Sequence, residues 1–310
     1  MAAVWPDLPY VAWRDTLQTL HLWSQIVGKI RLTLTPWLNH SWHVPLYVTV
    51  RGIGTSPIPV GDEILEIDFD FIGHRLVAKT SRGGEDGFSL APMPVAEFYR
   101  RIFDMLGHLE ASVAIDDTPS EMTGVPRYSE DSVHASYDPE AVHRFWRALV
   151  QADRVFKLFR SGFLGKASPV HFFWGSFDLA ATRFSGRTAP KHPGGVPGLP
   201  DAVACEAYSH EECSAGFWPG NEAFPQAAFY SYAYPEPAGY RDRAVTPGAS
   251  FNTTLGEFIL PYDAVRAASD PDALLLDFLQ TTYAAAADCG RWDRAALECP
   301  LGTPGKVRPT

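Results

Sequence analysis

The chain has 310 residues, of which 46% are hydrophobic and 20% charged, a composition typical of a soluble globular protein. Its net charge is −10 and its lysines and arginines form no basic patch, which argues against nucleic acid as a partner. No apolar run reaches the roughly 18 residues of a membrane span, and the N-terminal sequence lacks the pattern of a signal peptide. We therefore expect a cytoplasmic protein with no membrane partner. Four cysteines without a C-x-x-C pair fit that compartment.

The first half of the chain reads as a helix, a set of strands and a second helix. Residues 13–31 carry apolar side chains at helical spacing, and residues 95–110 form a second amphipathic pattern. Between them, residues 63–73 ("EILEIDFDFIG") alternate apolar and acidic side chains. That period of two predicts a strand in a sheet with one solvated face.

An acidic, polar stretch from Asp116 to Asp138 reads as a surface linker between two halves. Asp138 and Pro139 then form a helix start, and Asp270 and Pro271 repeat it near the C-terminus. We expect Gly290 to end that last helix. A Gly- and Pro-rich loop over residues 185–201 is long enough to act as a lid or binding loop.

The two halves resemble each other. "HLWSQIVGKI" (residues 21–30) is similar to "RFWRALVQAD" (residues 144–153), and "GFSLAP" (residues 87–92) is similar to "GEFILP" (residues 256–261). We therefore predict an internal duplication of helix, four strands and helix. The expected fold class is α+β, with two similar halves that are each an antiparallel sheet flanked by helices. The halves span residues 1–115 and 139–310, joined by the linker over residues 116–138.

Comparison of the halves points to a pocket in the second. Aligning the prolines at positions 45 and 169 sets His171 against Tyr47, and a second alignment sets His210 against Phe71 and Glu212 against Gly73. A buried polar group costs free energy unless it is paired, so a scaffold gains nothing from these exchanges. Aromatic residues make up 13% of the chain and often line small-molecule pockets.

The strands that carry these residues have predictable faces. Residues 167–187 read as one strand with His171 on one face and Asp178 on the other, so that these two side chains should not touch. In "SHEECSAGFWPG" a strand places His210, Glu212 and Ser214 on one face, and "FYSYAY" forms a stripe of tyrosines. The predicted pocket and its rim comprise His171, His210, Glu212, Arg183, Asp178, Trp174, Trp218, Tyr230 and Tyr232.

A histidine beside a glutamate in an aromatic pocket can move a proton near neutral pH. The leading hypothesis is therefore an enzyme that acts on a small polar or anionic organic molecule. His171, His210 and Glu212 would be catalytic, and Arg183 would hold an anionic group. The alternatives are a small-molecule-binding protein that does no chemistry, an interaction protein, and a structural role in which His171 is a core histidine and Asp178 pairs with Arg183. The oligomeric state stays open.

The cofactor also stays open. His171, His210 and Glu212 are the donor types of a two-histidine, one-carboxylate site for a divalent metal, although no histidine follows His210 as in the usual oxygenases of that type. His40 and His43 form a second pair, either bonded to backbone or joined to the second-half site. No nucleotide is expected, because phosphate-loop patterns are absent. No G-x-S-x-G elbow occurs, and Cys213 is a weak candidate nucleophile.

Several long motifs resemble those of an uncharacterised bacterial protein family, domain of unknown function 5996. They are "WPDLPY" near the N-terminus, "NHSWHVPLYVT", "PVHFFWGSFDLAATRFSGR" and "SHEECSAGFWPG", and the resemblance covers nearly the whole chain. It implies no activity, so the functional argument depends on the residues themselves.

Overall fold

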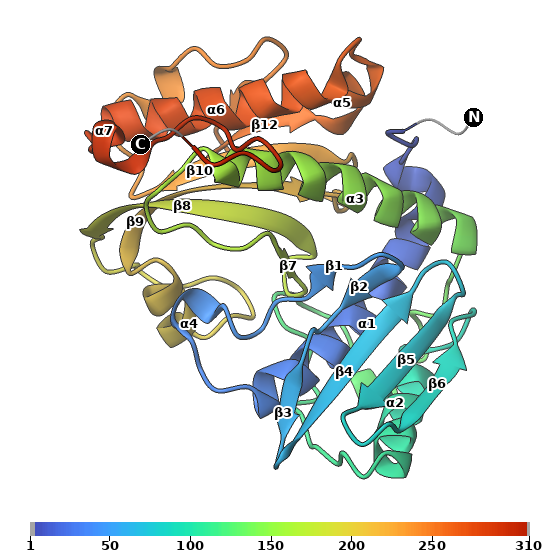
Figure 1. Cartoon of the computed structure of the whole chain (residues 1–310). Helices are drawn as coiled ribbons and strands as arrows, with labels where there is room; N and C mark the ends of the chain where they lie inside the picture. Colours follow the sequence, from blue (N-terminus) through green and yellow to red (C-terminus); the bar gives the residue numbers. More distant parts are fainter. Residues whose placement is uncertain (1–3, 309–310) are drawn as a thin grey trace.

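Two antiparallel sheets with helices packed on them make up the α+β fold (Figure 1). The computed structural model describes residues 4–308. The first half contains α1 (Tyr10–Leu34), β1 (Tyr47–Val48), β2 (Gly52–Gly54), β3 (Ile58–Val60), β4 (Glu63–Asp70), β5 (Arg75–Thr80), β6 (Glu85–Ser89) and α2 (Val95–His108). The second contains α3 (Pro139–Ser161), β7 (His171–Phe173), β8 (Asp178–Thr188), α4 (Asp201–Ala207), β9 (His210–Trp218), β10 (Ala228–Tyr234), β11 (Ser250–Asn252), β12 (Glu257–Pro261), α5 (Tyr262–Ala267), α6 (Pro271–Cys289) and α7 (Arg294–Leu297).

The two sheets meet at their edges. In the first sheet the strand order is β1-β2-β4-β5-β6, with β3 paired to β4, and in the second it is β11-β12-β10-β9-β8-β7. Leu46, just before β1, exchanges two backbone hydrogen bonds of 2.9 and 2.8 Å with Phe172 of β7. Because of this bridge, the loop before β1 and the start of β7 lie together where the halves join.

The helices and the alternating strand follow the sequence pattern. Asp138 caps α3 by accepting from the backbone N–H of Glu140 at 2.9 Å, and Asp270 caps α6 in the same way. In β4 the apolar set is buried and the acidic set is partly exposed, as the period of two predicts. Two details differ: among residues 4–308 each sheet has six strands rather than four, and α7 follows Gly290.

The segment over residues 167–187 is not one strand. The chain reverses in a tight turn over residues 174–177, where Phe177 has a φ of +59°, so β7 and β8 form a hairpin. His171 pairs with Ala180, and Phe173 pairs with Asp178. The hairpin therefore places His171 and Asp178 on the same face of the sheet, and the prediction of opposite faces is wrong. β8 continues to Thr188, which shortens the predicted loop to residues 189–200 before α4.

The two long helices of the second half, α3 and α6, cover one face of the second sheet, whereas α4 lies on the opposite side (Figure 1). Apolar residues of the strands face the two long helices, including Leu179, Phe217 and Phe229, and all three are fully buried. Within residues 4–308, no helix combines the length and the apolar character needed to cross a membrane.

The linker between the halves is anchored on α1 rather than lying loosely on the surface. Gln25 is fully buried, and its side-chain oxygen accepts from the Ser120 N–H at 2.8 Å and the Tyr128 hydroxyl at 2.7 Å, while its amide donates to the Ser120 carbonyl at 2.8 Å. Lys29, 5% exposed, donates to the carbonyls of Asp116 and Thr118. The polar side of α1 thus replaces the backbone partners that an irregular segment otherwise lacks.

We expect Gln25→Ala to lower the free energy of unfolding by about 2–4 kcal/mol, because it leaves several buried partners unpaired. Urea denaturation measures this loss. Gln18→Ala on the same helix is the matched control: its amide makes a single 3.3 Å hydrogen bond to Glu222 at the surface, so its loss should stay below about 0.5 kcal/mol. Equal losses in the two variants would contradict an anchoring role for Gln25.

Candidate functional site

The face of the second sheet turned away from α3 and α6 carries polar side chains on neighbouring strands. Glu212 of β9 lies opposite Tyr234 of β10, and Ser214 lies opposite Tyr232. The predicted face of β9 and the predicted tyrosine stripe of β10 are both confirmed, and the ladder shows that they share one surface. This surface is called the polar face below.

Asp178 lies at one end of the polar face. It is 6% exposed, and its carboxylate accepts hydrogen bonds from the hydroxyls of Tyr230 and Ser176. Burial raises the pKa of Asp178, against the opposing effect of these two hydrogen bonds. Burial, followed by the negative charge of Asp178, raises the pKa of Glu257 to about 7. Glu257 can therefore hold a proton near neutral pH, and burial shifts the pKa of Asp178 in the same direction.

The linker delivers a further carboxyl group to Asp178. Glu121 follows the anchored Ser120, and burial and the charge of Asp178 raise its pKa to about 7. Its carboxylate lies so close to Gly175 that a Cβ there would stand 2.0 Å from Oε1, so a larger residue in the turn between β7 and β8 would displace the Glu121 carboxylate. The Glu121 N–H also donates to the Gly198 carbonyl at 3.2 Å, which ties the loop over residues 189–200 to the linker.

Three tyrosines lie near the carboxyl groups. The hydroxyls of Tyr208 and Tyr232 lie 3.2 Å apart, and the rings of Tyr230 and Tyr232 stack at 6.2 Å. Burial raises the pKa of Tyr208 to about 12, and the charges of Glu212, Glu257 and Asp178 all add to the rise. The tyrosine–carboxyl cluster is defined by six residues: Asp178, Glu212, Glu257, Tyr208, Tyr230 and Tyr232.

Glu212 occupies the other end of this cluster. It is 6% exposed, and within residues 4–308 its carboxyl group makes no hydrogen bond. Burial raises its pKa to about 8, although the nearby charge of Lys166 acts in the opposite direction. Glu212 is therefore largely a neutral carboxylic acid at pH 7, able to donate a proton.

A lysine–histidine pair borders Glu212. Lys166 Nζ donates to His40 Nε2 at 2.6 Å, and His40 Nδ1 lies 2.7 Å from the Ala207 carbonyl. Because a carbonyl only accepts, Nδ1 carries the hydrogen and Nε2 is free to accept from lysine. The ring of His210 lies 5.6 Å from that of His40, so the loop histidine joins the second half, as one reading of the sequence proposed.

His171 stands apart from this arrangement. Its strand partner on β8 is Ala180, whereas His210 pairs with Thr188, so on the order of 20 Å of strand separates their backbones. The His171 ring lies against the rings of Trp42, Tyr47 and Phe173 at 5.4–6.0 Å. The prediction that His171 and His210 face one pocket therefore does not fit this geometry.

The proposed metal ligands are not brought together. Among residues 4–308, no three His, Cys, Asp or Glu side chains are grouped closely enough to hold a metal ion. His210 and Glu212 lie two residues apart on β9, whereas His171 lies opposite Ala180 near the other end of β8, which explains why the three do not converge. His43 does not complete such a set either: its Nδ1 accepts from the Leu38 N–H at 3.2 Å, and the residue is buried beside Trp37.

Arg183 does not line the polar face. It pairs with Cys213 on β9 and points toward the helices, 1% exposed. Its guanidinium carbon lies 3.5 Å from the ring centre of Phe159 and 4.4 Å from that of Tyr283, and it donates to the Phe159 carbonyl. The predicted substrate anchor is thus a packed core residue, and Lys166 is the cation beside the carboxyl groups.

The two predicted tryptophans also have structural contacts. Trp174 donates to the Val44 carbonyl at 2.8 Å and packs so tightly on α1 that a Cβ at Gly28 would lie 2.2 Å from its ring. It fastens the hairpin to the first half rather than lining the polar face. Trp218, at the end of β9, stacks on Phe224 at 5.7 Å.

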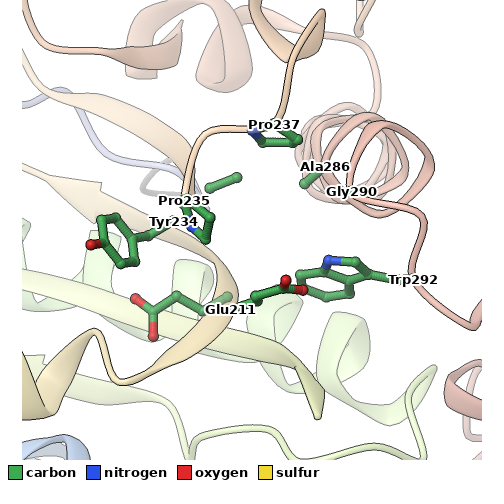
Figure 2. Close-up of a pocket in the computed structure, with 9 residues that line it drawn as sticks. Glu211, Tyr234, Pro235, Pro237, Ala286, Gly290 and Trp292 are labelled. Atoms are coloured by element: carbon green, nitrogen blue, oxygen red, sulfur yellow. The ribbon is translucent and has the colours of Figure 1, made fainter. Parts of the chain in front are cut away.

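A separate cleft of about 220 Å³ lies between the ends of β9 and β10 and the end of α6 (Figure 2). Tyr234, Pro235 and Trp292 form much of its wall. Glu211 also lines it, but this carboxylate is paired with Arg187 at 2.6 Å. Of the predicted site residues, Glu212 alone borders this cleft in the part of the chain that the structure describes.

Glu257, Tyr208 and Glu121 belong to the site without having been predicted. Glu257 belongs to the motif "GEFILP", which indicates the internal repeat. Its glutamate lies on β12, the strand next to the tyrosine stripe of β10, and this position could have identified it. Tyr208 immediately precedes the predicted "SHEEC" strand. Glu121 sits in an irregular segment, where no periodicity indicates the direction of a side chain.

The fold and the polar face define an α+β protein with a buried cluster of proton-holding groups. The family model for a family of unknown function, DUF5996, matches residues 5–299, and the chain belongs to this family. No curated protein and no solved structure matches the chain.

Proposed function

We propose that the protein is an enzyme that performs acid–base chemistry on a small polar organic molecule at the tyrosine–carboxyl cluster. The observation that carries this proposal is the placement of Asp178, Glu212 and Glu257 around Tyr208, with pKa values of about 8 for Glu212 and about 7 for Glu257. Groups that titrate near neutral pH can both give and take a proton, which is what general acid–base catalysis requires.

The roles follow from the different surroundings of the carboxyl groups. Glu212, neutral and without a hydrogen-bond partner, would donate a proton to the substrate. Glu257 would accept one, and Asp178 would be held in place by Tyr230. Lys166 would attract an anionic group of the substrate, the role that the sequence suggested for Arg183. The tyrosine hydroxyls would orient the substrate by hydrogen bonds.

The test is a panel of small hydroxy acids, keto acids, sugars and amines, followed by NMR for binding and for conversion. We expect Glu212→Gln to lower the turnover of a converted compound by roughly 10²–10⁴-fold, the usual contribution of a positioned proton donor. Glu211→Gln is the matched control, because Glu211 points to the opposite face and pairs with Arg187. Turnover that Glu212→Gln leaves unchanged would refute the proposal, and a compound that binds without being converted would favour the alternative of a binding protein.

Three further expectations are part of this proposal. The four cysteines are free thiols, which supports a cytoplasmic location. The net charge of −10 supports a small molecule, rather than nucleic acid or a membrane, as the partner. The order helix, antiparallel sheet and helix occurs in both halves and supports an internal duplication.

A further inference from the structure

The carboxyl groups at the two ends of the tyrosine–carboxyl cluster are almost completely covered. Asp178 and Glu212 are each 6% exposed. Among residues 4–308, those that line the cleft of Figure 2 include Glu212 but not Asp178, Glu257 or Tyr208. A substrate therefore reaches the whole cluster only when a part of the protein that covers the polar face moves aside.

The segment between β8 and β9, residues 189–209, leaves the second sheet and returns to it at the same point. Thr188 of β8 pairs with His210 of β9, and the Ala189 N–H donates to the Ser209 carbonyl at 3.0 Å. Adjacent ends of this kind are typical of Ω-loops, which are often functional. The segment, called the flap below, includes α4 on the side of the sheet opposite to α3 and α6 (Figure 1). It can swing about its adjacent ends without breaking the ladder of the sheet.

The flap contributes almost nothing to the hydrophobic core. The structure describes all of residues 189–209, and Ala204 is the one buried residue among them. No side chain of these residues belongs to the core cluster. Segments with few buried apolar contacts open at a lower free energy than the elements around them. The flap therefore opens more easily than the strands that it covers.

Hydrogen bonds from the surrounding elements hold the flap closed. Their donors and acceptors are the Trp37 indole and the Glu206 carboxylate, His40 Nδ1 and the Ala207 carbonyl, the Tyr234 hydroxyl and the Pro190 carbonyl, and the Glu121 N–H and the Gly198 carbonyl. Trp37 is 51% exposed, so water can replace its bond to Glu206. Because each such bond contributes little net free energy, the closed position is reversible.

The flap also completes the cluster. Tyr208, near its end, brings its hydroxyl to 3.2 Å from that of Tyr232. The His192 ring stacks on the Tyr208 ring with 4.7 Å between their centres, and lies 5.2 Å from the ring of Tyr234. Within the flap, the Cys205 thiol donates to the His192 carbonyl at 3.3 Å. This bond joins α4 to the loop that precedes it, so the two parts move together.

We propose that the flap is a lid over the tyrosine–carboxyl cluster, which opens to admit the substrate and on closing returns Tyr208 to its place beside Tyr232. The purpose of this motion rests on the proposed function, whereas the motion itself follows from the packing of the flap. Closing then excludes water and completes the site around the bound molecule, as lids do in other enzymes. The flap overlaps residues 185–201, for which the sequence predicts a lid or a binding loop.

The test is the reactivity of a thiol placed under the flap of the full-length protein. Ser214→Cys introduces this thiol on the polar face, at a position that is 3% exposed and lies opposite Tyr232, the partner of Tyr208. The wild type gives the background from the native cysteines. We expect iodoacetamide to alkylate the new thiol much faster than the protein unfolds globally. Removal of the bond to Trp37 by Glu206→Ala should accelerate the reaction about two- to tenfold, the effect of one hydrogen bond.

A control variant and a second reporter show whether the flap opens as one body. Glu222→Ala is the matched control, because this surface glutamate accepts a 3.3 Å hydrogen bond from Gln18 outside the flap, and its alkylation rate should match that of the unmodified flap. The Glu121 N–H, bonded to the Gly198 carbonyl before α4, is the second reporter, and Glu206→Ala should accelerate its hydrogen exchange by a similar factor.

Three results would overturn the proposal. They are a thiol that reacts no faster than the protein unfolds, equal alkylation rates in Glu206→Ala and Glu222→Ala, and faster exchange in α4 without faster exchange at Glu121, which would indicate local fraying. None of these measurements uses a substrate. A failure of the lid is therefore distinct from a failure of the proposed catalysis, which the panel of compounds tests.

Discussion

Glu212→Gln is expected to raise the melting temperature at pH 8 by about 5–10 °C and to leave it nearly unchanged at pH 4.5. Burial raises the pKa of Glu212 from 4.5 to about 8 in the folded protein. The folded state thus keeps a proton that the unfolded chain has lost, and stability falls as the pH rises from about 4.5 to about 8. At about 1.4 kcal/mol for each pKa unit, the cost at pH 8 is on the order of 4 kcal/mol, and the amide of glutamine avoids it.

The measurement is thermal unfolding across this pH range for the wild type, Glu212→Gln and the control Glu211→Gln. The control should follow the wild-type profile, because Glu211 is ion-paired with Arg187 on the opposite face. Parallel profiles for the wild type and Glu212→Gln would show that Glu212 is ionised without cost. A variant that gains stability and loses turnover is the pattern expected when a site residue is kept for function.

Arg183→Ala is expected to lower the free energy of unfolding by about 3–5 kcal/mol, the range for truncating a large buried side chain. The guanidinium fills the space between Phe159, Phe163 and Tyr283, so alanine leaves a cavity beneath α3 and α6. Burial lowers the pKa of Arg183 to about 10, a sign that the charged form is poorly solvated there.

Arg183→Met separates packing from charge. Methionine fills most of the space and removes the buried charge, so its stability should lie within about 1 kcal/mol of the wild type or above it. Urea denaturation midpoints measure both variants. If Arg183→Met lowered the free energy of unfolding as much as Arg183→Ala, the charge rather than the packing would stabilise the fold. If both variants weakened ligand binding equally, the hypothesis that Arg183 anchors the substrate would be restored.

Periodicity predicted those parts of this protein in which one face of an element is buried. The helix starts at Asp138 and Asp270 and the alternation in β4 are local signals, and each is confirmed. The same reasoning predicts that Glu212 and Ser214 share one face of their strand and that the tyrosines form a stripe, and the ladder between β9 and β10 confirms both. These predictions required only that the strand be regular.

The errors arose where the chain turns. An apolar run from His171 to Asp178 has no strong turn residue apart from Gly175, so its hairpin was read as a continuous strand and the relation of His171 to Asp178 was inverted. Arg183 is predicted to hold the substrate because of its charge. The alternation of side chains along β8, however, directs Arg183 into the core. Glu121 and Tyr208 reach the site through irregular backbone, whose course depends on tertiary contacts rather than on local pattern.

The anchoring of the linker on α1 has a consequence for how this protein tolerates change. Ser120 is held by Gln25, and the next residue carries a carboxyl group into the polar face. One residue inserted between them would displace that carboxyl group by roughly 3.5 Å, more than the length of a hydrogen bond. The segment accordingly behaves as a spacer of fixed length, in which insertions and deletions are not neutral.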